Sequence, residues 1–580
     1  MKNQFINKMF RQFMFPSILA AVGLAVANIA DSLVVGMSTG SVGLATIGIT
    51  APIYMIYAVF YVGLGVGGSI EFARLAGAGK NKEALQIFNK TMMASVIIGL
   101  FFSVTGLFFT RQVLWILGTV PGDGALYHLS YEYAHVLLLS APVFFINTPL
   151  FIFIRNDDNP KLSGFGFAVG NITDVLLNFV LVLGMKVGVA GSVWATVIGQ
   201  CVSIGIFSIH FIRKKHIIRF APVFPRLRQT MRILKNGLST SNQYISLFVF
   251  IMLANHILSE KLGDSGVAVF DIVLNVSYVG LLFFNAASDA LQPLSSTFHG
   301  ERNVEAQHKV YQLAMVSGVI LGILLLAGIM IGAGSICRLF GVKDSGELKL
   351  GILAVRIYCV GAVFGGINML MTVYCQSVEN YRKAYLISLL RGTVLLLLFT
   401  MVCSLLRVEL FFMLFPLTEI SCLLIVSILD RYAFIQSREE LPGEDRIYSL
   451  MLGKNEKNLA EVIEKIEEFC ERFGATAKQN YYVTVTVEEI CSAILDNANI
   501  GKNDDLYISL TIISELNGDF RLCIRDNALE FNPFDLKAKK VEEEDDDETL
   551  GGLGILIVRS KAKNFYYRHY LNFNTLNILV

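Results

Sequence analysis

The sequence predicts an all-α polytopic membrane protein with twelve transmembrane helices in two six-helix repeats, followed by a small α+β domain. Composition is the first reason: 54% of the 580 residues are hydrophobic and 16% are charged, which a soluble protein of this length does not show. The second reason is a series of apolar segments that ends near residue 434. The third is the change to a soluble composition that follows it.

Each apolar segment is long enough to cross a bilayer as a helix. The segments cover residues 13–37, 44–69, 91–109, 132–154, 163–184, 189–211, 237–260, 266–289, 312–332, 350–376, 384–406 and 410–434. Basic residues gather in alternate connections, so the positive-inside rule puts both ends of the chain in the cytoplasm. We therefore expect a multi-pass protein of the cell membrane, whose first span is a retained anchor.

The two halves of the membrane region resemble each other. GLATIGITAPIYMIYAVF (43–60) is similar to GVAVFDIVLNVSYVGLLF (266–283), and both lead to a glycine and a charged turn. The expected units are a first half at 1–211, a basic linker at 212–236, a second half at 237–434, a short linker at 435–446 and a tail at 447–580. An even number of spans per half makes the repeats parallel. Two bundles around a central cavity indicate a transporter, because neither a channel nor a receptor needs this plan.

The first span carries a carboxylate, Asp31, inside its apolar run. A charge there is costly unless it is hydrated, paired or protonated. Asn28 lies three residues earlier, on the same helical face. The pair indicates an ion or proton site, and the alternative is a structural polar contact.

Several segments identify a family. The spans resemble the multidrug and toxic compound extrusion (MATE) family of cation-coupled antiporters over roughly residues 5–435. The resemblance lies in the Asn28–Asp31 helix, GLATIGITAPI (43–53), GVAGSVWAT (188–196), GVAVFDIV (266–273), LQPLSSTFHGERN (291–303), RKAYLISLLRG (382–392) and FPLTE (415–419), and in their order. It implies that Asp31 binds the coupling cation or proton, helped by an Asn/Asp pair on the fifth helix and a threonine on the sixth.

In this chain the fifth-helix pair is Asp174 and Asn178, the reverse of the family's usual order, and the threonine is Thr196. The reversal moves the charge by one helical turn, and with it the expected position of the ion. Asp31 and Asp174 in one cavity can take up a proton, or share a Na⁺ with amide and hydroxyl oxygens. For Asp174 the alternative is a buried aspartate that only holds Asn178.

The second half has charges of its own. Arg391 and Glu419 lie on neighbouring spans and form either a structural ion pair or part of a substrate site. Asp271 is the third candidate for a second-half polar site; it falls near the outer end of a span, so the alternative is that it is simply solvated. The nine cysteines and the histidines show no spacing typical of a metal site, and we expect no bound metal.

The tail alternates helices and strands. The expected elements are helices at 455–474 and 481–498, two strands around an Asn-Gly turn at 506–528, a solvated acidic loop at 542–548, a helix at 551–562 and closing strands at 565–580. This order resembles the GHKL (Bergerat) ATP-binding domain of histidine kinases and, more closely, that of anti-sigma-factor kinases.

That resemblance implies nucleotide-binding residues, and two of them are altered. The matching positions are the acidic Glu489, the adenine-reading Asp526, Gly552 and Gly554 of the second glycine box, and the late polar Asn574. The asparagine for Mg²⁺ is replaced by Ala493, and the glycine after the aspartate by Ala528. Alanine cannot ligate Mg²⁺, and its side chain can block a close backbone approach. ATP binding stays possible in the tail, with at most weak ATPase or kinase activity; the alternative is a domain that kept only the fold.

The leading function is a secondary antiporter that exports organic, cationic, drug-like compounds against Na⁺ or H⁺. It needs no catalytic residue and no cofactor beyond the coupling ion. One alternative is a lipid-linked precursor flippase of the wider superfamily, which often has an arginine-rich cavity, whereas these spans hold mainly Arg356 and Arg391. The other is a membrane sensor whose tail binds a regulatory protein. The expected partners are a small organic substrate and the bilayer, with no nucleic acid.

Overall fold

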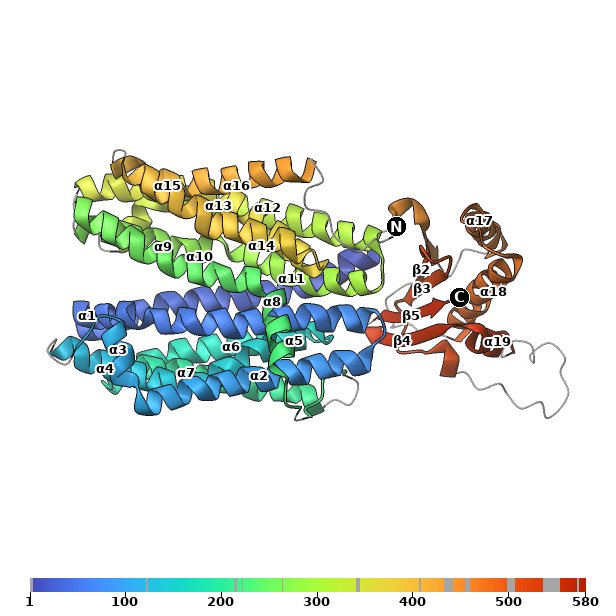
Figure 1. Cartoon of the computed structure of the whole chain (residues 1–580), viewed down its shortest axis with the longest axis horizontal. Helices are drawn as coiled ribbons and strands as arrows, with labels where there is room; N and C mark the ends of the chain where they lie inside the picture. The colour runs from blue at the N-terminus through green and yellow to red at the C-terminus, as the bar shows by residue number, and fades with distance from the viewer. Residues whose placement is uncertain are drawn as a thin grey trace.

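A computed structural model shows a long helical bundle with the tail at one end (Figure 1). It describes residues 4–120, 124–212, 216–221, 223–262, 264–340, 345–405, 408–431, 442–453, 459–497, 506–535, 553–570 and 573–580. Within these ranges ten helices are long and apolar enough to cross a bilayer, and two bent helix pairs raise the number to as many as twelve. The predicted fold class is confirmed.

The first half forms one side of the bundle, blue to teal in Figure 1. Its helices are α1 (Gln4–Gly77), α2 (Asn81–Phe108), α3 (Thr110–Ile116), α4 (Ala125–Leu139), α5 (Ala141–Asn156), α6 (Pro160–Asn178), continued by a π-helical turn at Phe179–Gly184, and α7 (Val189–Ile212). α1 holds two candidate spans, Phe5–Thr39 and Ala45–Gly77, in one helix. The fourth predicted span is the bent pair α4 and α5.

The second half forms the other side, green to orange in Figure 1. It follows the short α8 (Leu227–Asn236), which lies in the predicted linker. Its helices are α9 (Leu238–Leu262), α10 (Asp264–Gly280), α11 (Leu282–Gly300), α12 (Val304–Leu339), α13 (Ser345–Ser377), α14 (Tyr381–Leu389), a π-helical turn at Leu390–Val394, α15 (Leu395–Ser404), a 3₁₀ turn at Val408–Met413 and α16 (Leu414–Arg431).

Three helix connections repeat one kind of turn, in which an asparagine caps the next helix. The side-chain oxygen of each asparagine accepts a backbone N–H group. Asn159 accepts from Leu162 at 3.3 Å, Asn303 from Ala306 at 2.9 Å and Asn380 from Lys383 at 3.3 Å. The residues just before them have positive φ: Asp158 (69°), Arg302 (61°) and Glu379 (58°). A left-handed residue ends one helix and the asparagine begins the next, so consecutive helices are joined by very short turns.

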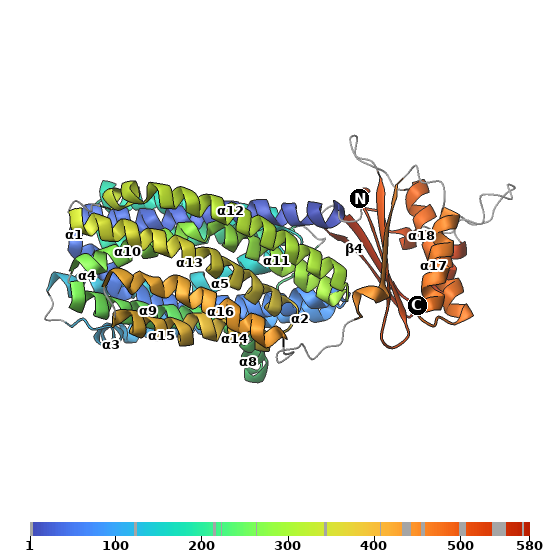
Figure 2. The same cartoon turned by 90° about the horizontal axis from the view of Figure 1, so that it is seen from above.

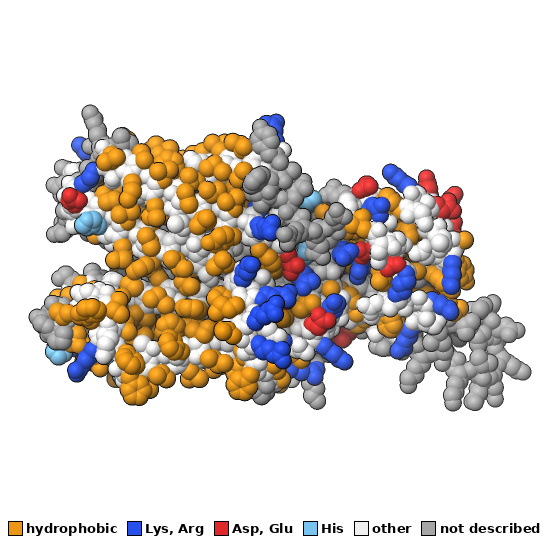
Figure 3. All heavy atoms as spheres, in the orientation of Figure 1, with side chains coloured by type: hydrophobic (Ala, Val, Ile, Leu, Met, Phe, Trp, Pro, Cys, Tyr) orange, Lys and Arg blue, Asp and Glu red, His pale blue; other side chains and the backbone are white. Residues whose placement is uncertain are grey.

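The outer surface of the bundle is apolar. Phe101 is 67% exposed and Ile331 85% exposed, and hydrophobic side chains cover the visible face of the bundle (Figure 3). Lys and Arg side chains gather instead in a band between this apolar surface and the tail. Such an inversion of the soluble pattern suits a surface that faces lipid, with cations at the level of the headgroups.

The tail is a five-stranded antiparallel sheet covered on one face by helices (Figure 2). Its strands are β1 (Ile447–Gly453), β2 (Tyr507–Ser514), β3 (Phe520–Asp526), β4 (Asn564–Tyr570) and β5 (Phe573–Leu579), in the spatial order β1-β2-β3-β5-β4. The covering helices are α17 (Leu459–Arg472), α18 (Ala477–Asn497) and α19 (Leu553–Lys561). β1 extends the predicted set of strands. The acidic loop at 542–548 lies outside the described residues.

Helices α17 and α18 bury the stripe that their amphipathic patterns predict. Ile466 of α17 and Val487 and Ile490 of α18 are fully buried with Leu522 of β3 and Ile578 of β5. Burying each such side chain contributes roughly 1.5–3 kcal/mol. The tail therefore has a hydrophobic core of its own. The other face of its sheet lies toward the bundle, and both ends of the chain are at this end of the molecule (Figures 1 and 2).

Candidate functional site

A polar cluster in the first half is organised by Asn178. Asp31 comes from α1, and Asp174 and Asn178 come from consecutive turns of α6. The side-chain Nδ2 of Asn178 donates to Oδ1 of Asp31 and, at 3.0 Å, to Oδ1 of Asp174. Two carboxylates from different helices therefore share one amide donor.

The carbonyl oxygen of the same amide, Asn178 Oδ1, is buried and has no hydrogen-bond partner within the described structure. Buried oxygens are nearly always paired, so this one marks a place for a further ligand. Thr196 of α7, whose hydroxyl donates to the carbonyl of Ser192 at 3.2 Å, lines the same cleft as Asp174 and adds a hydroxyl oxygen. Carboxylate, amide and hydroxyl oxygens are the ligands that hard cations prefer.

Asn28 is the fifth residue predicted for the ion site. It lies one turn before Asp31 on α1 and is half-buried. The structure thus brings Asp31, Asp174, Asn178 and Thr196 together and has Asn28 on the adjoining turn. Their part in ion binding stays a prediction. The structural alternative for Asp174, a hydrogen bond with Asn178, is present as well, and the two readings are compatible because one amide contacts both carboxylates.

Sequence reasoning missed four polar residues around this cluster. Gln200, one turn after Thr196 on α7, lines the same small cleft as Asp174 and accepts a hydrogen bond from Asn147 of α5. Tyr54 of α1 and Tyr133 of α4 are hydrogen-bonded to each other and interact electrostatically with Asp31 and Asp174. The available signal was the spacing of Gln200 from Thr196, since residues four apart share a helical face.

The second-half charges are arranged differently. Arg391 Nη2 lies 2.8 Å from Glu419 Oε1, and Arg391 Nε donates to the same oxygen at 3.2 Å. Asn368 of α13 donates its side-chain amide to the other oxygen of Glu419 at 2.8 Å. The pair is largely buried, with side-chain exposures of 13% and 16%, so the carboxylate is neutralised in place. Asp271 is exposed on α10, where Asn275 donates to its carboxylate at 3.2 Å.

In the tail, the predicted adenine-reading Asp526 lies at the end of β3, opposite Asn574 of β5. Oδ1 of Asp526 accepts from the Asn574 side chain at 2.7 Å and from the backbone N–H of Ala528 at 3.0 Å. Burial raises the pKa of Asp526 to about 6, against the lowering effect of these two donors. Asn574 is held in turn by Tyr567 and His569, whose side chains lie 2.6 and 2.8 Å from its Oδ1.

In the described part of the tail, the remaining predicted positions do not form a set of metal ligands. Glu489 lies half-buried on α18, and its pKa is raised by burial and by the neighbouring Glu488. Ala493 and Ala528 are both buried in the hydrophobic core of the tail, so neither position offers an oxygen ligand. Gly552 lies outside the described residues, and Gly554 lies near the start of α19. The residues thus fit recognition of an adenine amino group better than they fit a bound Mg²⁺.

One further cluster was not foreseen: Asp157, His210 and His216 have potential metal-ligand atoms within 4.8 Å of one another. The Asp157 carboxylate accepts the backbone N–H groups of Ile217 and Ile218 at 3.2 and 3.0 Å, and lies 3.1 Å from His210 Nε2. The two imidazole rings are stacked, with centroids 3.8 Å apart. A metal ion bound by a histidine lies close to the plane of the imidazole ring, and one ion cannot lie in the planes of two stacked rings. We therefore interpret the cluster as a structural contact that joins the start of the linker to α5 and α7.

Comparison with known proteins gives the class of the bundle. A likeness to solved transporters extends over most of it. An outward-facing multidrug resistance MATE family transporter of the MOP superfamily superposes with a TM-score of 0.68 at 22% identity, over 73% of this chain and 95% of that one. A MOP superfamily transporter from Pyrococcus furiosus gives a TM-score of 0.66 at 22% identity, over 74% and 96%. The bundle therefore has the fold of these two solved transporters.

The family follows from the sequence itself. Residues 16–180 and 239–402 match the MatE family model, and the chain belongs to the MatE family. The Multidrug export protein MepA of Staphylococcus haemolyticus is 22% identical over 393 residues, 67% of this chain and 86% of that protein. The Probable multidrug resistance protein YoeA of Bacillus subtilis is 27% identical over 282 residues, 46% and 59%. Residues 453–578 match the family model of the Histidine kinase-like ATPase domain, which confirms the resemblance of the tail.

Proposed function

We propose that this protein exports organic, cationic, drug-like compounds and draws the energy from an inward Na⁺ or H⁺ gradient. Membership of the MatE family and the names of the multidrug relatives support the export of small organic compounds. The chain lies in the cell membrane with its tail and both ends in the cytoplasm. The basic band beside the tail supports this orientation.

The observation that carries the proposal is the sharing of Asn178 by Asp31 and Asp174, with the amide oxygen of Asn178 unpaired. Two carboxylates beside one another in an apolar surrounding need a compensating cation or proton. A bound Na⁺ would be held by Asp31, Asp174, Asn178 and Thr196. A proton would be held by one of the two carboxylates.

Transport into sealed vesicles tests the coupling. Purified protein is reconstituted, a Na⁺ gradient and a pH gradient are imposed separately, and uptake of a fluorescent organic cation such as ethidium is followed. Uptake driven by one gradient and absent in an Asp31→Asn variant is expected. Asp271→Asn is the matched control, because it removes an exposed carboxylate from the other half. Uptake that ignores both gradients would contradict the coupling.

The second half favours a drug-like cation over a lipid-linked pyrophosphate. A flippase for such a precursor needs cations that are available to phosphate groups. Arg391 is already neutralised by Glu419 at 2.8 Å, and the exposed Arg356, whose Nε donates to the carbonyl of Met330 at 3.4 Å, does not by itself make an arginine-rich cavity. Competition of uptake by anionic lipid-linked precursors, with none by organic cations, would favour the flippase instead.

For the tail we propose recognition of an adenine nucleotide without effective hydrolysis. Asp526 offers a buried carboxylate for an exocyclic amino group, and alanine stands at the Mg²⁺ position. ATP when bound would present its amino group to Asp526, whose second oxygen is not taken by Asn574 or Ala528. Calorimetry on the full-length protein with ATP, with and without Mg²⁺, should give binding that Mg²⁺ hardly improves. Binding that strictly needs Mg²⁺, or rapid turnover, would contradict this assignment.

A further inference from the structure

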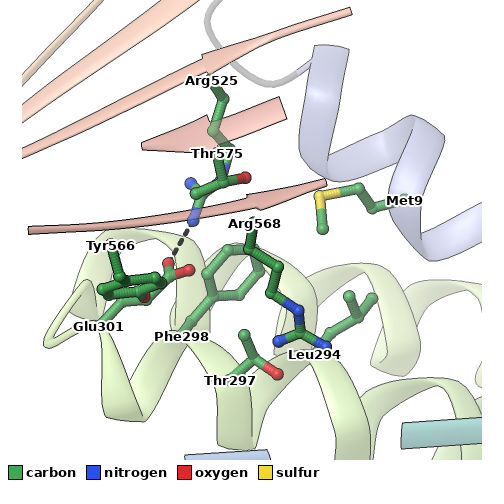
Figure 4. A pocket seen from close by; sticks show the side chains of 9 residues that line it. All are labelled: Met9, Leu294, Thr297, Phe298, Glu301, Arg525, Tyr566, Arg568 and Thr575. Atoms are coloured by element: carbon green, nitrogen blue, oxygen red, sulfur yellow. Dashed lines mark hydrogen bonds and ion pairs between the residues drawn. The ribbon is translucent and has the colours of Figure 1, made fainter. Parts of the chain in front are cut away.

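The tail does not hang freely from the bundle. The sheet face opposite its helices lies against the bundle (Figure 2), and at its centre Arg525 of β3 pairs with Glu301, which directly follows α11. Both side chains are buried, at 8% and 5% exposure. The Arg525 guanidinium also lies over the ring of Phe298, 5.1 Å from its centroid. Figure 4 shows Arg525 and Glu301 reaching toward each other from the sheet and from the end of α11.

The same sheet face contacts both halves of the transporter. In the second half, Arg302 Nη1 lies 2.7 Å from Glu515 of the tail. In the first half, the Tyr566 hydroxyl donates to the carbonyl of Gly77, the last residue of α1. The start of α1 is held as well, because the rings of Phe5 and Phe573 lie 4.9 Å apart.

This interface is closely filled. The cavity that remains between Met9, Leu294, Arg525 and Arg568 measures about 10 Å³, little more than the space of one water molecule. Separating the tail would expose apolar rings and leave Glu301 without its cation. The buried pair fixes how the two surfaces meet, because neither Arg525 nor Glu301 can stay buried without the other.

Beneath the tail, the two halves are joined to each other. Three contacts, which we call the tail-side gate, cross from the first half to the second: Arg155 to Asp289 at 2.7 Å, Asn156 to Gln292 at 3.2 and 3.3 Å in both directions, and Arg74 to Glu379 at 2.7 Å. Backbones also approach closely here, because a Cβ on Gly77 would collide with the carbonyl of Thr297. The gate is therefore closed in this structure, directly under the tail.

We propose that the tail is an intramolecular clamp that holds the tail-side gate closed. Alternating access requires the two halves to part at this end. A single sheet that contacts both ends of α1 and the end of α11 opposes that separation, because these helix ends belong to the parts that must move apart. The transporter opens toward the tail side only when the sheet has left one of the two halves, at Glu301 or at Gly77. This role is independent of which ion or compound is moved.

Hydrogen exchange measured by mass spectrometry, on the full-length protein in lipid nanodiscs, tests the clamp without any transport substrate. Arg525→Ala removes the central contact, and Glu301→Ala removes it from the bundle side. The readout is exchange in peptides around Asn156, which belongs to the gate and does not line the tail interface. We expect about tenfold faster exchange there in both variants, and no further increase in the double variant.

Lys465→Ala is the matched control, because it breaks an exposed tail ion pair with Glu461, 2.7 Å apart on α17, and should leave the gate unchanged. Slow exchange around Val487 in the tail core shows that a variant is folded. If the tail core of a variant does not fold, the same exchange measurement is made on a chain that ends at Arg431. The clamp predicts that the gate also exchanges faster in this chain, which has no tail. Unchanged exchange around Asn156 in this shortened chain would overturn the proposal.

Discussion

The two halves of the bundle share a fold, but their buried carboxylates have different partners. In the first half Asp31 and Asp174 accept hydrogen bonds from the same amide of Asn178. In the second half Glu419 accepts one from Asn368 and is paired with Arg391. An asparagine holds the carboxylate in both, but only one half provides a counter-charge. A repeat that lacks a built-in cation has room for a mobile one, and this difference supports our proposal that the coupling ion binds in the first half.

The tail offers a third case of the same arrangement. Asp526 accepts from the Asn574 amide at 2.7 Å, with neither a second carboxylate nor an arginine among its hydrogen-bond partners. Its charge is opposed only by burial. The three sites thus differ in the group that faces the carboxylate, and substitutions can test whether that group sets their behaviour.

The largest expected effect is on Asp31. Asp31→Asn removes one of the two carboxylates and keeps the size of the side chain, so gradient-driven efflux should fall to the level of empty vesicles while expression stays near normal. Vesicle transport with matched protein amounts measures it. Asp174→Asn should also impair coupling, and more than Glu419→Gln does. Equal and mild losses from Asp174→Asn and Glu419→Gln would remove the distinction between the halves.

Glu419→Gln should instead act on stability. It leaves the Arg391 guanidinium, 13% exposed, without an anionic partner, and breaking a buried pair costs about 3–5 kcal/mol. Thermal unfolding of the detergent-solubilised protein should shift down, and coupling should survive in the folded fraction. The double change Glu419→Gln with Arg391→Met restores neutrality and should recover part of the loss. A full loss of coupling in a Glu419→Gln variant of normal stability would show that the Arg391–Glu419 pair takes part in transport.

Asp526 should give a smaller, pH-dependent effect in the tail. Its folded pKa of about 6 lies above the unfolded value of about 3.9. The folded tail therefore binds the extra proton between these values, and its stability falls as pH rises through about 6, by roughly 2–3 kcal/mol in total. Hydrogen exchange of tail peptides from pH 4.5 to 7.5, corrected for intrinsic rates, should show this slope. The slope should be absent in Asp526→Asn, and its persistence there would assign it to another group.

Thr196→Val should have the smallest effect. It removes one neutral hydroxyl from Asp174 and keeps the side-chain volume, a loss of about 1 kcal/mol. The concentration of coupling ion for half-maximal transport should rise about fivefold, with the maximal rate retained. Thr173→Val is a matched control, because the Thr173 hydroxyl also donates to a carbonyl four residues earlier, that of Val169, but Thr173 does not line the cleft that Thr196 shares with Asp174. Similar changes in both variants would exclude a special role for Thr196.

Most of the fold was predictable because its signals are local. Runs of apolar residues define the spans, and the 3.6-residue and two-residue periods define the tail helices and strands. Asp31 stood out because a carboxylate in an apolar run is costly. Asp174, Asn178 and Thr196 were found from the family resemblance. β1 was not, because IYSLMLG follows a linker directly and carries no hairpin partner beside it in sequence.

The contact between tail and bundle could not be predicted. Arg525 reads as an ordinary charged residue at the end of a strand, and Glu301 as part of a charged turn. They are 224 residues apart, and no periodicity links two surfaces that pack from separate domains. Tyr54 and Tyr133 were missed for a related reason: a tyrosine in a span looks like packing until its hydroxyl is seen against a partner.

β3 carries consecutive residues with unrelated surroundings. Successive side chains of a strand point to opposite faces, so Arg525 meets the bundle while Asp526 belongs to the side covered by helices. No side chain or loop separates the two positions, only a single peptide unit. A ligand that shifts the backbone of β3 at Asp526 therefore acts directly beside Arg525. An engineered ligand-binding module is therefore best connected to the bundle through β3. Its effect on the bundle is measured at the contact with Glu301.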